Sequence, residues 1–298
     1  MISHLRRLRA AFQGGRSFLS RHPAYSRHRL RSWIRVANWY AQVSAGISPV
    51  RKIPSWQLDV KLPRLFKTPA KVFFLFGKEY DEMLEFVDLS LNPGETFIDV
   101  GANFGIYSYL AARKVGACGR VFAIEPTPSM CSILRENAQA NFLGNLDVIQ
   151  AAFGERSGTS LLNLHADSGR SSLRDMRSEV VGRIQVAVQT LDASIPDRQS
   201  VAMIKMDVEG YEPHVLAGGR QRIQRDHPVI LFENNPGALN EAGSSTDALC
   251  GMLAEFGYSI YHYAGARTLV KTTPAGFGNF VALHGSSLSE RFGTWTIS

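Results

Sequence analysis

The 298-residue sequence has little cysteine and no long apolar run, and its acidic residues are unevenly distributed along the chain. Its three cysteines, Cys118, Cys131 and Cys250, form no CxxC pair, which argues against a disulfide scaffold or a structural zinc site and predicts a reducing, cytoplasmic environment. The apolar run at 72–76 is far shorter than the roughly 20 residues that a membrane span requires. Arginines interrupt the first 16 residues, so no signal peptide is predicted.

Acidic residues are almost missing from the N-terminal fifth of the chain. Residues 1–60 contain 11 lysines and arginines but a single acid, Asp59, whereas the remainder contains 22 basic and 25 acidic residues. Such a segment binds an acidic partner, or it forms a solvated helical layer on the main domain. Leu5, Leu8 and Phe12 share one helical face among arginines, as in a short interfacial helix. We predict a basic helical appendage over 1–60 and a main domain over 61–298, with peripheral membrane contact through residues 1–40 left open.

The main domain alternates short apolar runs with helical patterns. This alternation predicts an α/β fold with a parallel sheet and helices on both faces. The predicted strands are 97–100, 121–124, 148–153, 201–206 and 229–232. Two final strands, 258–263 and 279–283, have no helix-length pattern between them, so an antiparallel hairpin is expected at the end of the sheet.

Between and before these strands the sequence predicts further elements. A helix is expected over 79–89, and another begins at Pro128 with Thr127 as its N-cap. The proline-rich region 49–69 is predicted to be an irregular linker or capping layer. Alternating stretches at 160–164 and 184–188 predict two extra strands, and the polar loop 165–172 either faces the substrate or forms a surface hairpin.

The loop D-V-G-A-N-F-G at 99–105 excludes two nucleotide classes by what it lacks. Gly105 is followed by isoleucine rather than Lys-Ser/Thr, which excludes a triphosphate loop. Asn103 stands where a dinucleotide loop needs its middle glycine. S-adenosylmethionine carries no phosphate. It needs an acid near its cationic methionine end, which Asp99 supplies, and a backbone that leaves it room, which Gly101 and Gly105 supply. Glu125 then follows at the end of the next predicted strand, where an acid binds ribose hydroxyls.

Five stretches of the sequence resemble the FkbM family of S-adenosylmethionine-dependent methyltransferases. They are NPGETFIDVGANFGIYS (92–108), VFAIEP (121–126), SSL (171–173), VAMIKMDVEG (201–210) with the following 211–219, and VILFE (229–233). The likeness runs from about residue 79 to 283, and its most family-specific element is K-x-D-x-E-G at 205–210.

The resemblance implies a Rossmann-like class I methyltransferase fold with seven mostly parallel strands and an antiparallel strand near one edge. It also implies S-adenosylmethionine as cofactor and O-methylation of a hydroxyl on a saccharide, lipid-linked glycan or secondary metabolite. By position, the cofactor-binding motif falls on Asp99, Gly101, Asn103, Gly105 and Glu125. Three neighbours are predicted to bind with them: Ala102, Tyr107, and Pro126, which favours an extended Glu125.

An alcohol needs a base to become a good nucleophile, and ligands of open α/β sheets bind at the carboxyl ends of the strands. The candidates there are Asp207, Glu209, Glu233, Asn234 and, further off, His214 and His165. We predict Asp207 or Glu209 as base or acceptor-orienting carboxylate; the alternatives are a cofactor contact for Asp207 and a helix cap for Glu209. Asp207 with Glu233 and Asn234 could also hold a divalent metal, but the spacing does not demand one, and no metal is predicted.

Two other function classes stay open. Amino-methylating DNA enzymes carry an Asp/Asn-Pro-Pro-Tyr/Phe loop, and the nearest match here, E-N-N-P at 233–236, has one proline and no aromatic, so no DNA partner is predicted. Trp33, Trp39 and Tyr40 lie among arginines, which keeps RNA methylation through the N-terminal arm possible in principle. A non-catalytic binding module is expected to lose Asp99 or Glu125, yet both are present. The expected location is cytoplasmic, with or without contact at the inner membrane face.

Overall fold

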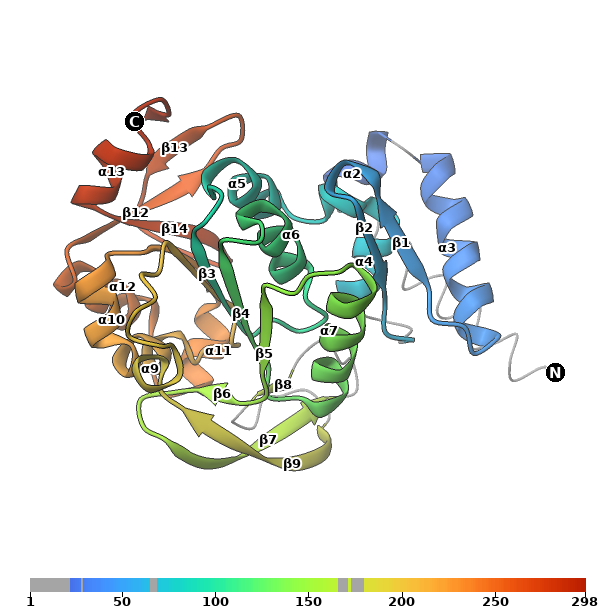
Figure 1. The fold of residues 1–298 in the computed structure, drawn as a ribbon, viewed down its shortest axis with the longest axis horizontal. Coiled ribbons are helices and arrows are strands. Elements are labelled where there is room, and N and C mark those ends of the chain that lie inside the picture. Colours follow the sequence, from blue (N-terminus) through green and yellow to red (C-terminus); the bar gives the residue numbers. More distant parts are fainter. Residues whose placement is uncertain (1–21, 28, 65–68, 166–170, 173–179) are drawn as a thin grey trace.

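A nine-stranded sheet forms the centre of the computed structural model, which describes residues 22–27, 29–64, 69–165, 171–172 and 180–298 (Figure 1). Its strand order is β15–β13–β12–β14–β11–β10–β3–β4–β5. Five neighbouring strands are parallel: β5 (Leu146–Ile149), β4 (Arg120–Ile124), β3 (Thr96–Val100), β10 (Met203–Met206) and β11 (Val229–Asn234). The predicted α/β class and parallel core are confirmed.

The other edge of the sheet is antiparallel. Strand β14 (Gly278–His284) lies between β11 and β12 (Tyr258–Tyr263) and is antiparallel to both. The predicted antiparallel end is therefore confirmed, but seven strands are two too few for the described sheet. Strand β13 (Thr268–Lys271) folds back on the outer side of β12, and β15 (Thr296–Ile297) pairs with β13.

Apolar residues on both sides of each central strand bury the sheet between two layers of helices. In β3, Phe97 packs into one core and its neighbours Ile98 and Val100 into the other, as the period of two in a strand requires. The first core is covered by α5 (Glu82–Ser90), α6 (Ile106–Val115) and α7 (Pro128–Ala140). The second is covered by α9 (Glu212–Gly218), α10 (Arg220–Asp226), α11 (Pro236–Glu241) and α12 (Thr246–Glu255).

Helix starts follow capping chemistry, with two differences from the predictions. Helix α7 begins at Pro128 as predicted, but the Thr127 hydroxyl makes no capping hydrogen bond. Helix α5 begins at Glu82 rather than 79, because Asp81 accepts the Met83 N–H at 3.0 Å and a short 3-10 turn, η2 (Gly77–Tyr80), precedes it. Two short helices, α8 (Leu191–Ser194) and α13 (Gly285–Arg291), complete the main domain.

The region predicted as an irregular linker is ordered instead. Strands β1 (Val50–Ile53) and β2 (Leu58–Lys61), joined by η1 (Pro54–Trp56), form an antiparallel hairpin, and α4 (Pro69–Phe76) follows. The side chains of Asn137 in α7 and of Asn141, the C-cap of that helix, accept the N–H groups of Lys61 and Asp59, each at 2.8 Å, which fixes the hairpin against the main domain. A boundary at residue 60 falls inside β2, and the division into 1–60 and 61–298 stays a prediction.

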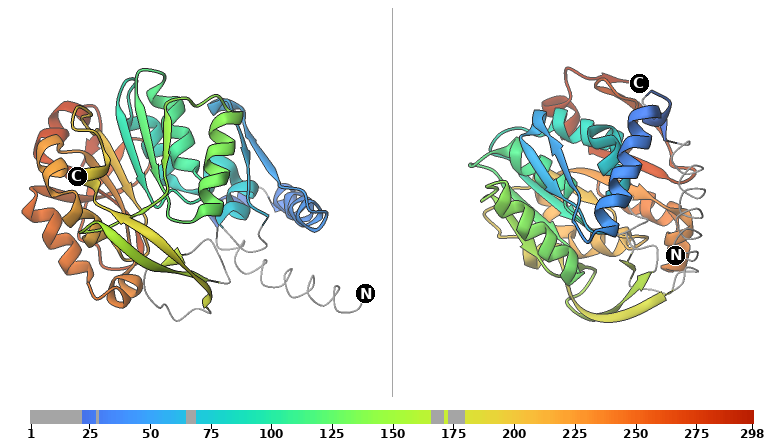
Figure 2. Two further views of the ribbon diagram at one scale, coloured as in Figure 1. Left: turned by 60° about the horizontal axis from the view of Figure 1, so that its bottom comes forward. Right: turned by 90° about the vertical axis from the view of Figure 1, so that its right-hand side faces the viewer.

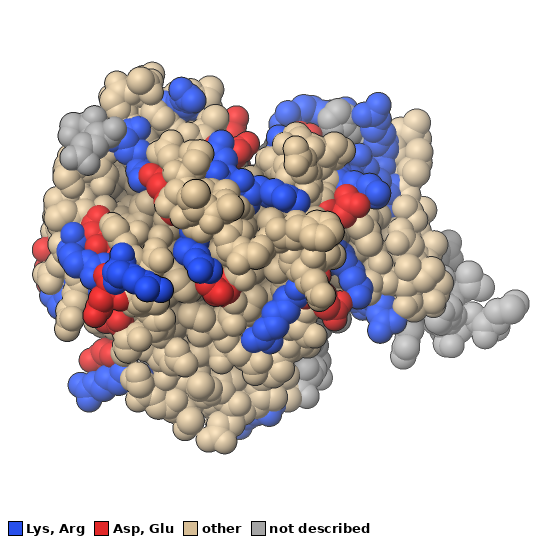
Figure 3. Space-filling view, viewed as in Figure 1, with Lys and Arg blue, Asp and Glu red and all other residues tan. Residues whose placement is uncertain are grey.

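Helices α2 (Pro23–Arg27) and α3 (Arg29–Ser44) precede the hairpin, and basic side chains gather on this end of the molecule (Figure 3). The leucines and phenylalanine predicted to form an interfacial helix, Leu5, Leu8 and Phe12, lie outside the described residues. Within the described ranges, no helix has both the length and the apolar character needed to cross a membrane. The apolar run 72–76 is part of α4, which is buried from Ala70 to Phe76.

A second, four-stranded sheet lies beside the main domain (Figure 2). Its strands are β6 (Ala152–Phe153), β9 (Val180–Gln189), β7 (Gly158–His165) and β8 (Ser171–Ser172). The extra strands predicted at 160–164 and 184–188 are confirmed as the antiparallel pair β7 and β9. The strand predicted at 148–153 divides into β5 and β6, because β6 leaves the central sheet to pair with β9. Most of the loop 165–172 lies outside the described residues.

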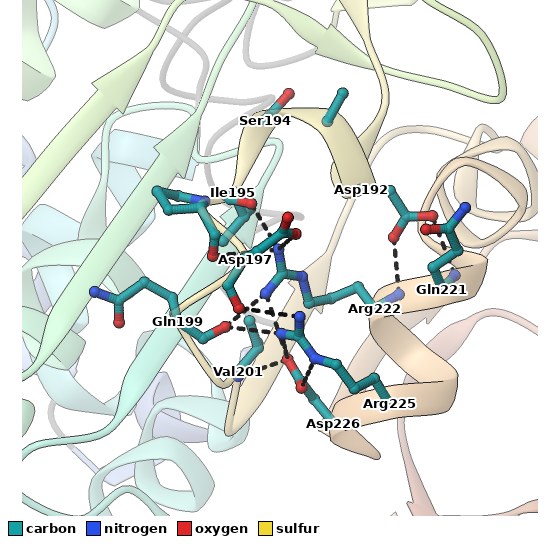
Figure 4. Close-up of polar contacts among 12 residues, drawn as sticks. Asp192, Ser194, Ile195, Asp197, Gln199, Val201, Gln221, Arg222, Arg225 and Asp226 are labelled. Carbon is teal, nitrogen blue, oxygen red and sulfur yellow. Dashed lines mark hydrogen bonds and ion pairs between the residues drawn. The ribbon is translucent and has the colours of Figure 1, made fainter.

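An arginine network, defined here as Asp192, Arg222, Arg225 and Asp226, fixes the segment that leads into β10 (Figure 4). The buried Arg222 guanidinium donates to the carbonyls of Gln199 at 2.5 Å and Ile195 at 2.6 Å. Asp226 accepts the Val201 N–H at 2.9 Å, and Arg225 binds both Asp226 oxygens. Strand β10 is thereby held at its N-terminal end.

Candidate functional site

Lys205 connects two strands at the other end of β10. It lies in register with Asp99 of β3, and its Nζ is 3.5 Å from Asp99 Oδ1 and 3.6 Å from Asp207 Oδ2. Its ammonium also lies over the Tyr107 ring, 5.0 Å from the centroid. Burial lowers the pKa of Lys205, but the charges of Asp207 and Asp99 outweigh it, so the net shift is upward. Lys205 is therefore a buried cation. We call Lys205, Asp99 and Asp207 together the Lys205 bridge.

Asp99 is fully buried within this bridge. Its Oδ2 accepts the Ser108 hydroxyl at 2.6 Å, and its Oδ1 faces Lys205. Asp99 thus joins β3, α6 and β10 at the strand ends, which explains why the family-specific lysine at 205 accompanies an acid at 99. The sequence alone paired Asp99 with the methionine end of a cofactor, and that contact stays a prediction.

The glycines of the 99–105 loop are required by the packing of the chain on itself. A Cβ at Gly101 (φ 79°) would lie 2.0 Å from the backbone oxygen of Asp207. A Cβ at Gly105 (φ 91°) would lie 2.3 Å from a methyl carbon of Leu134. Asn103 also takes a left-handed conformation, with φ 52°, which asparagine tolerates better than most residues. The clearance predicted for a ligand is taken up, at these two glycines, by Asp207 and Leu134.

Glu125 follows the last residue of β4, as predicted, and its carboxylate ties together two turns. Oε2 accepts the Asn103 N–H at 2.9 Å and Oε1 accepts the Thr127 N–H at 2.8 Å. Burial raises the pKa of Glu125 in spite of these hydrogen bonds. The Thr127 side chain makes a third hydrogen bond to the carboxylate, which leaves about one of its four lone-pair sites for a ribose hydroxyl. Ala102 is buried in this loop, and Pro126 separates Glu125 from Thr127.

Five carboxylates, which we call the acidic cluster, surround the strand ends: Asp81, Asp207, Glu209, Glu212 and Glu233. The Tyr107 hydroxyl donates to Asp81 Oδ2 at 2.6 Å, and the amide of Asn279 reaches the same oxygen at 3.5 Å. Burial raises the pKa of Asp81, against the opposing hydrogen bond from Tyr107. Sequence reasoning missed Asp81, because it falls inside the helix predicted over 79–89 and outside every recognised motif.

Two members of the acidic cluster have strongly shifted pKa values. Burial, with the charges of Asp207 and Glu209, raises the pKa of Glu233 to about 8. Burial raises the pKa of Glu212 to about 7, although its Oε1 accepts the Val208 N–H at 3.0 Å. No described donor reaches the buried Oε2 of Glu212. Carboxyl groups held partly protonated near neutral pH are typical of functional sites.

The alternative role predicted for Glu209, a helix cap, belongs to another residue. Tyr211 occupies the N-cap position of α9, and Glu212 rather than Glu209 binds a backbone N–H there. Glu209 itself has φ 52°, and Gly210 (φ 92°) follows because a Cβ there would lie 2.3 Å from the Ala238 oxygen. The E-G pair therefore forms a left-handed turn that packs on α11.

The remaining candidates for a base or a metal ligand have structural roles or lie outside the described residues. The Asn234 amide donates to the Gly276 carbonyl at 2.7 Å, and its oxygen accepts the Thr246 hydroxyl at 2.9 Å, so it is already bonded at both ends. Among the described residues, no three His, Cys, Asp or Glu side chains are grouped to hold a metal ion. The His214 ring lies 4.4 Å from that of Tyr211, and the side chain of His165 lies outside the described residues.

A comparison with family models identifies the family of this chain. A family model described as the methyltransferase FkbM domain matches residues 99–260, which is more than half of the chain. The 2-O-methyltransferase NoeI of Sinorhizobium fredii is 26% identical over 196 residues, covering 58% of this chain and 76% of that protein. The matched span contains the Lys205 bridge, Glu125 and four of the five carboxylates of the acidic cluster.

Other similar proteins match a smaller share of their own length. An arsenite methyltransferase of Halobacterium salinarum is 40% identical over 58 residues, which is 20% of this chain and 15% of that protein. The crystal structure of methyltransferase FkbM from Methylobacillus flagellatus is 18% identical with a TM-score of 0.42, covering 72% of this chain and 54% of that one. This chain thus spans about half of the crystallised protein and a small part of the arsenite methyltransferase.

Proposed function

Because the chain belongs to the FkbM methyltransferase family, we propose that it transfers the methyl group of S-adenosylmethionine to a hydroxyl of a glycan or small-molecule acceptor. The observation that carries the proposal is the buried Glu125 carboxylate at the end of β4, beside a loop that has neither the lysine nor the glycine spacing for phosphates. The name of NoeI, a 2-O-methyltransferase, supports oxygen as the acceptor atom.

The charges of the site favour a cationic donor. Burial and like charges raise the pKa values of Glu212 and Glu233, so further negative charge is disfavoured there. The charge of Lys205 opposes the rise in the pKa of Glu233 but does not cancel it. A sulfonium brought into this region would be stabilised by the carboxylates, whereas a diphosphate would be repelled. S-adenosylmethionine thus fits the charge of the site, with Glu125 as the ribose acceptor.

In the proposed reaction the acceptor oxygen forms a bond to the methyl carbon while the carbon–sulfur bond breaks, leaving S-adenosylhomocysteine. The hydroxyl proton passes to a carboxylate. Alignment of the three atoms supplies about 7–11 kcal/mol of the barrier, and a positioned base adds about 10²–10⁴-fold in rate. We assign the base to Asp207, whose side chain is 44% exposed and ion-paired with Lys205. Glu209 is less suited, because its Oε2 is buried.

Donor binding is tested by thermal unfolding with and without S-adenosylmethionine. A ligand at 100 times its Kd stabilises the folded state by about 2.7 kcal/mol. We expect this shift for the native chain and its loss in Glu125→Ala, while Glu255→Ala, an exposed glutamate on α12, keeps it. A shift with NADH in place of S-adenosylmethionine would contradict the proposal.

Methyl transfer is tested with methyl-labelled S-adenosylmethionine and a panel of glycans, phenolic metabolites and RNA. We expect label on a hydroxyl-bearing glycan or metabolite, and a rate lowered by about 10²–10⁴-fold in Asp207→Asn with donor affinity kept. Label on RNA alone would favour the nucleic-acid class. Donor binding with no transfer to any acceptor would favour a non-catalytic binding module.

A further inference from the structure

Helix α3 has two apolar faces, although only one of them meets the protein. Val36, Trp39 and Val43 are buried on its inner face. On the opposite face Leu30 is 76% exposed and Ile34 is 62% exposed. A surface helix ordinarily turns charged and polar side chains to solvent on that side. The outer face of α3 is therefore apolar without a partner among the described residues.

The exposed apolar residues form a continuous stripe. Ala37 and Ala41, both exposed, follow Leu30 and Ile34 at spacings of three and four residues, which places all four on one side of the helix. Ile47, 54% exposed, follows just beyond the end of α3. The helix lies at the edge of the molecule (Figure 1).

Arginines border the stripe on both sides. By the 100° step of a helix, Arg29 falls on one flank of the stripe, and Arg31 and Arg35 fall on the other. Arg51 of β1 adds a further guanidinium close to Arg35: burial and the Arg35 charge lower the pKa of Arg51 to about 10. Burial and the Arg31 charge likewise lower the pKa of Arg35. The half-buried Arg35 donates to the Leu75 carbonyl of α4. Arg29 and Arg31, both exposed, are therefore the flanking cations that can meet an anion outside the protein.

We propose that the outer face of α3 docks on an anionic membrane surface, with the Leu30–Ile34 stripe inserted at the headgroup boundary and the flanking arginines on lipid phosphates. An interfacial helix has this combination of an apolar stripe and basic flanks. RNA would bind the arginines but leave Leu30 and Ile34 in water. A second copy of the chain would bring another set of arginines against these. The excess of 11 basic residues over one acid in residues 1–60 complements lipid charge.

The test is flotation of the full chain with phosphatidylcholine vesicles that contain or lack phosphatidylglycerol. We expect binding only to the anionic vesicles. Leu30→Ser with Ile34→Ser should weaken it by at least about tenfold, since two apolar side chains would no longer be buried at the headgroup boundary. Arg29→Gln with Arg31→Gln should weaken it by about fivefold per arginine. The matched controls are Leu161→Ser, a 57% exposed leucine on β7, and the exposed Arg156→Gln.

Three results would overturn the docking proposal. They are equal binding to neutral and anionic vesicles, unchanged binding by the Leu30/Ile34 variant, and a dimer in sedimentation that this variant dissociates. A gel shift with RNA that the Leu30/Ile34 variant keeps, in the absence of vesicle binding, would assign the face to nucleic acid instead. Thermal melting checks that each variant is folded. No methyl donor is needed, so docking and methyl transfer can fail independently.

Discussion

Strand β10 has buried charge at both of its ends, and the two ends differ in how that charge is satisfied. At the N-terminal end, the arginine network gives the Arg222 and Asp226 side chains partners along the segment 195–201 and within α10. At the C-terminal end, Lys205 is the ion-pair partner of both Asp99 and Asp207. Glu212 Oε2 has no described donor, and the pKa of Glu233 is raised to about 8. One strand thus connects a complete network with an incomplete one.

The difference indicates what each end does. A buried ionic network whose members are all bonded fixes the chain, and removing one member leaves another charge unpaired. Buried polar atoms without partners cost free energy and are rare in native proteins unless a ligand, ion or reaction uses them. We infer that the arginine network stabilises the fold, whereas the acidic cluster is shaped for a cationic ligand. Each prediction below alters one end and reads the effect on both stability and activity.

The largest effect on stability is expected at the arginine network. Arg222→Leu removes the charged hydrogen bonds to the carbonyls of Ile195 and Gln199, while Asp226 keeps Arg225 as its partner, so the free energy of unfolding should fall by about 3–5 kcal/mol. Urea denaturation measures the change. Donor affinity and kcat of the folded variant should stay unchanged.

Arg220→Leu is the matched control on the same helix. Its guanidinium is exposed and lies 3.9 Å from Glu255, so its loss should cost less than about 1 kcal/mol. If Arg222→Leu cost no more than this control, or if it lowered donor affinity, the division between a structural and a functional end of β10 would be wrong.

The second effect is expected at the Lys205 bridge and should lower both stability and activity. Lys205→Met leaves the fully buried Asp99 with only the Ser108 hydrogen bond, which should cost about 3 kcal/mol of stability. Because Asp207 also loses its ion pair, kcat should fall at least about tenfold if Asp207 is the base. Urea denaturation and initial rates measure the two effects separately.

Lys114→Met is the control for Lys205. This partly exposed lysine is 3.3 Å from Asp88, and its loss should cost at most about 1 kcal/mol with kcat unchanged. A Lys205 variant that loses stability but keeps full kcat would make the bridge structural, like the arginine network.

The third effect concerns the serine that completes the bridge. Ser108→Ala removes the 2.6 Å hydrogen bond to Asp99 Oδ2, and a bond to a charged group contributes about 1.5–3 kcal/mol. Ser90→Ala is the control, because Ser90 is also buried and donates at 2.6 Å, but to the neutral Phe86 carbonyl of its own helix, at a cost of about 1 kcal/mol. Equal losses in urea denaturation would show that the charge on Asp99 adds nothing.

Much of the fold follows from the sequence, because buried parallel strands are short apolar runs bounded by turns. The runs at 97–100 and 121–124 match β3 and β4 to within one residue, and 258–263 matches β12. Helix α4 was missed because its apolar residues are continuous and show no period, and β15 because two residues at a sheet edge carry no pattern. Such elements are determined by their tertiary neighbours.

The site could be predicted only where its residues lie within the recognised motifs. Asp99, Glu125 and Asp207 lie at the predicted strand ends. The pairing of Lys205 with Asp99 depends on the register of β10 against β3, which no local pattern encodes. Asp81 reaches the site through the Tyr107 hydroxyl, from a helix that precedes the motif in the chain. Neither signal exists before the strands and helices are assembled.

The smallest effect should grow as pH rises from about 5 to 8 and should separate the two ends most cleanly. The pKa of Glu233 is about 8 in the folded protein against 4.5 as its ordinary value, so between these values the folded state binds more protons than the unfolded one. Stability therefore falls as pH rises through this window. Glu233→Gln cannot ionise, so it should be more stable than the native chain by on the order of 2 kcal/mol near pH 9, with little difference near pH 5. Urea denaturation across pH measures this, and Glu255→Gln, an exposed glutamate near Arg220, should leave the slope unchanged. Parallel curves for Glu233→Gln and the native chain would mean that the acidic cluster is as well satisfied as the arginine network.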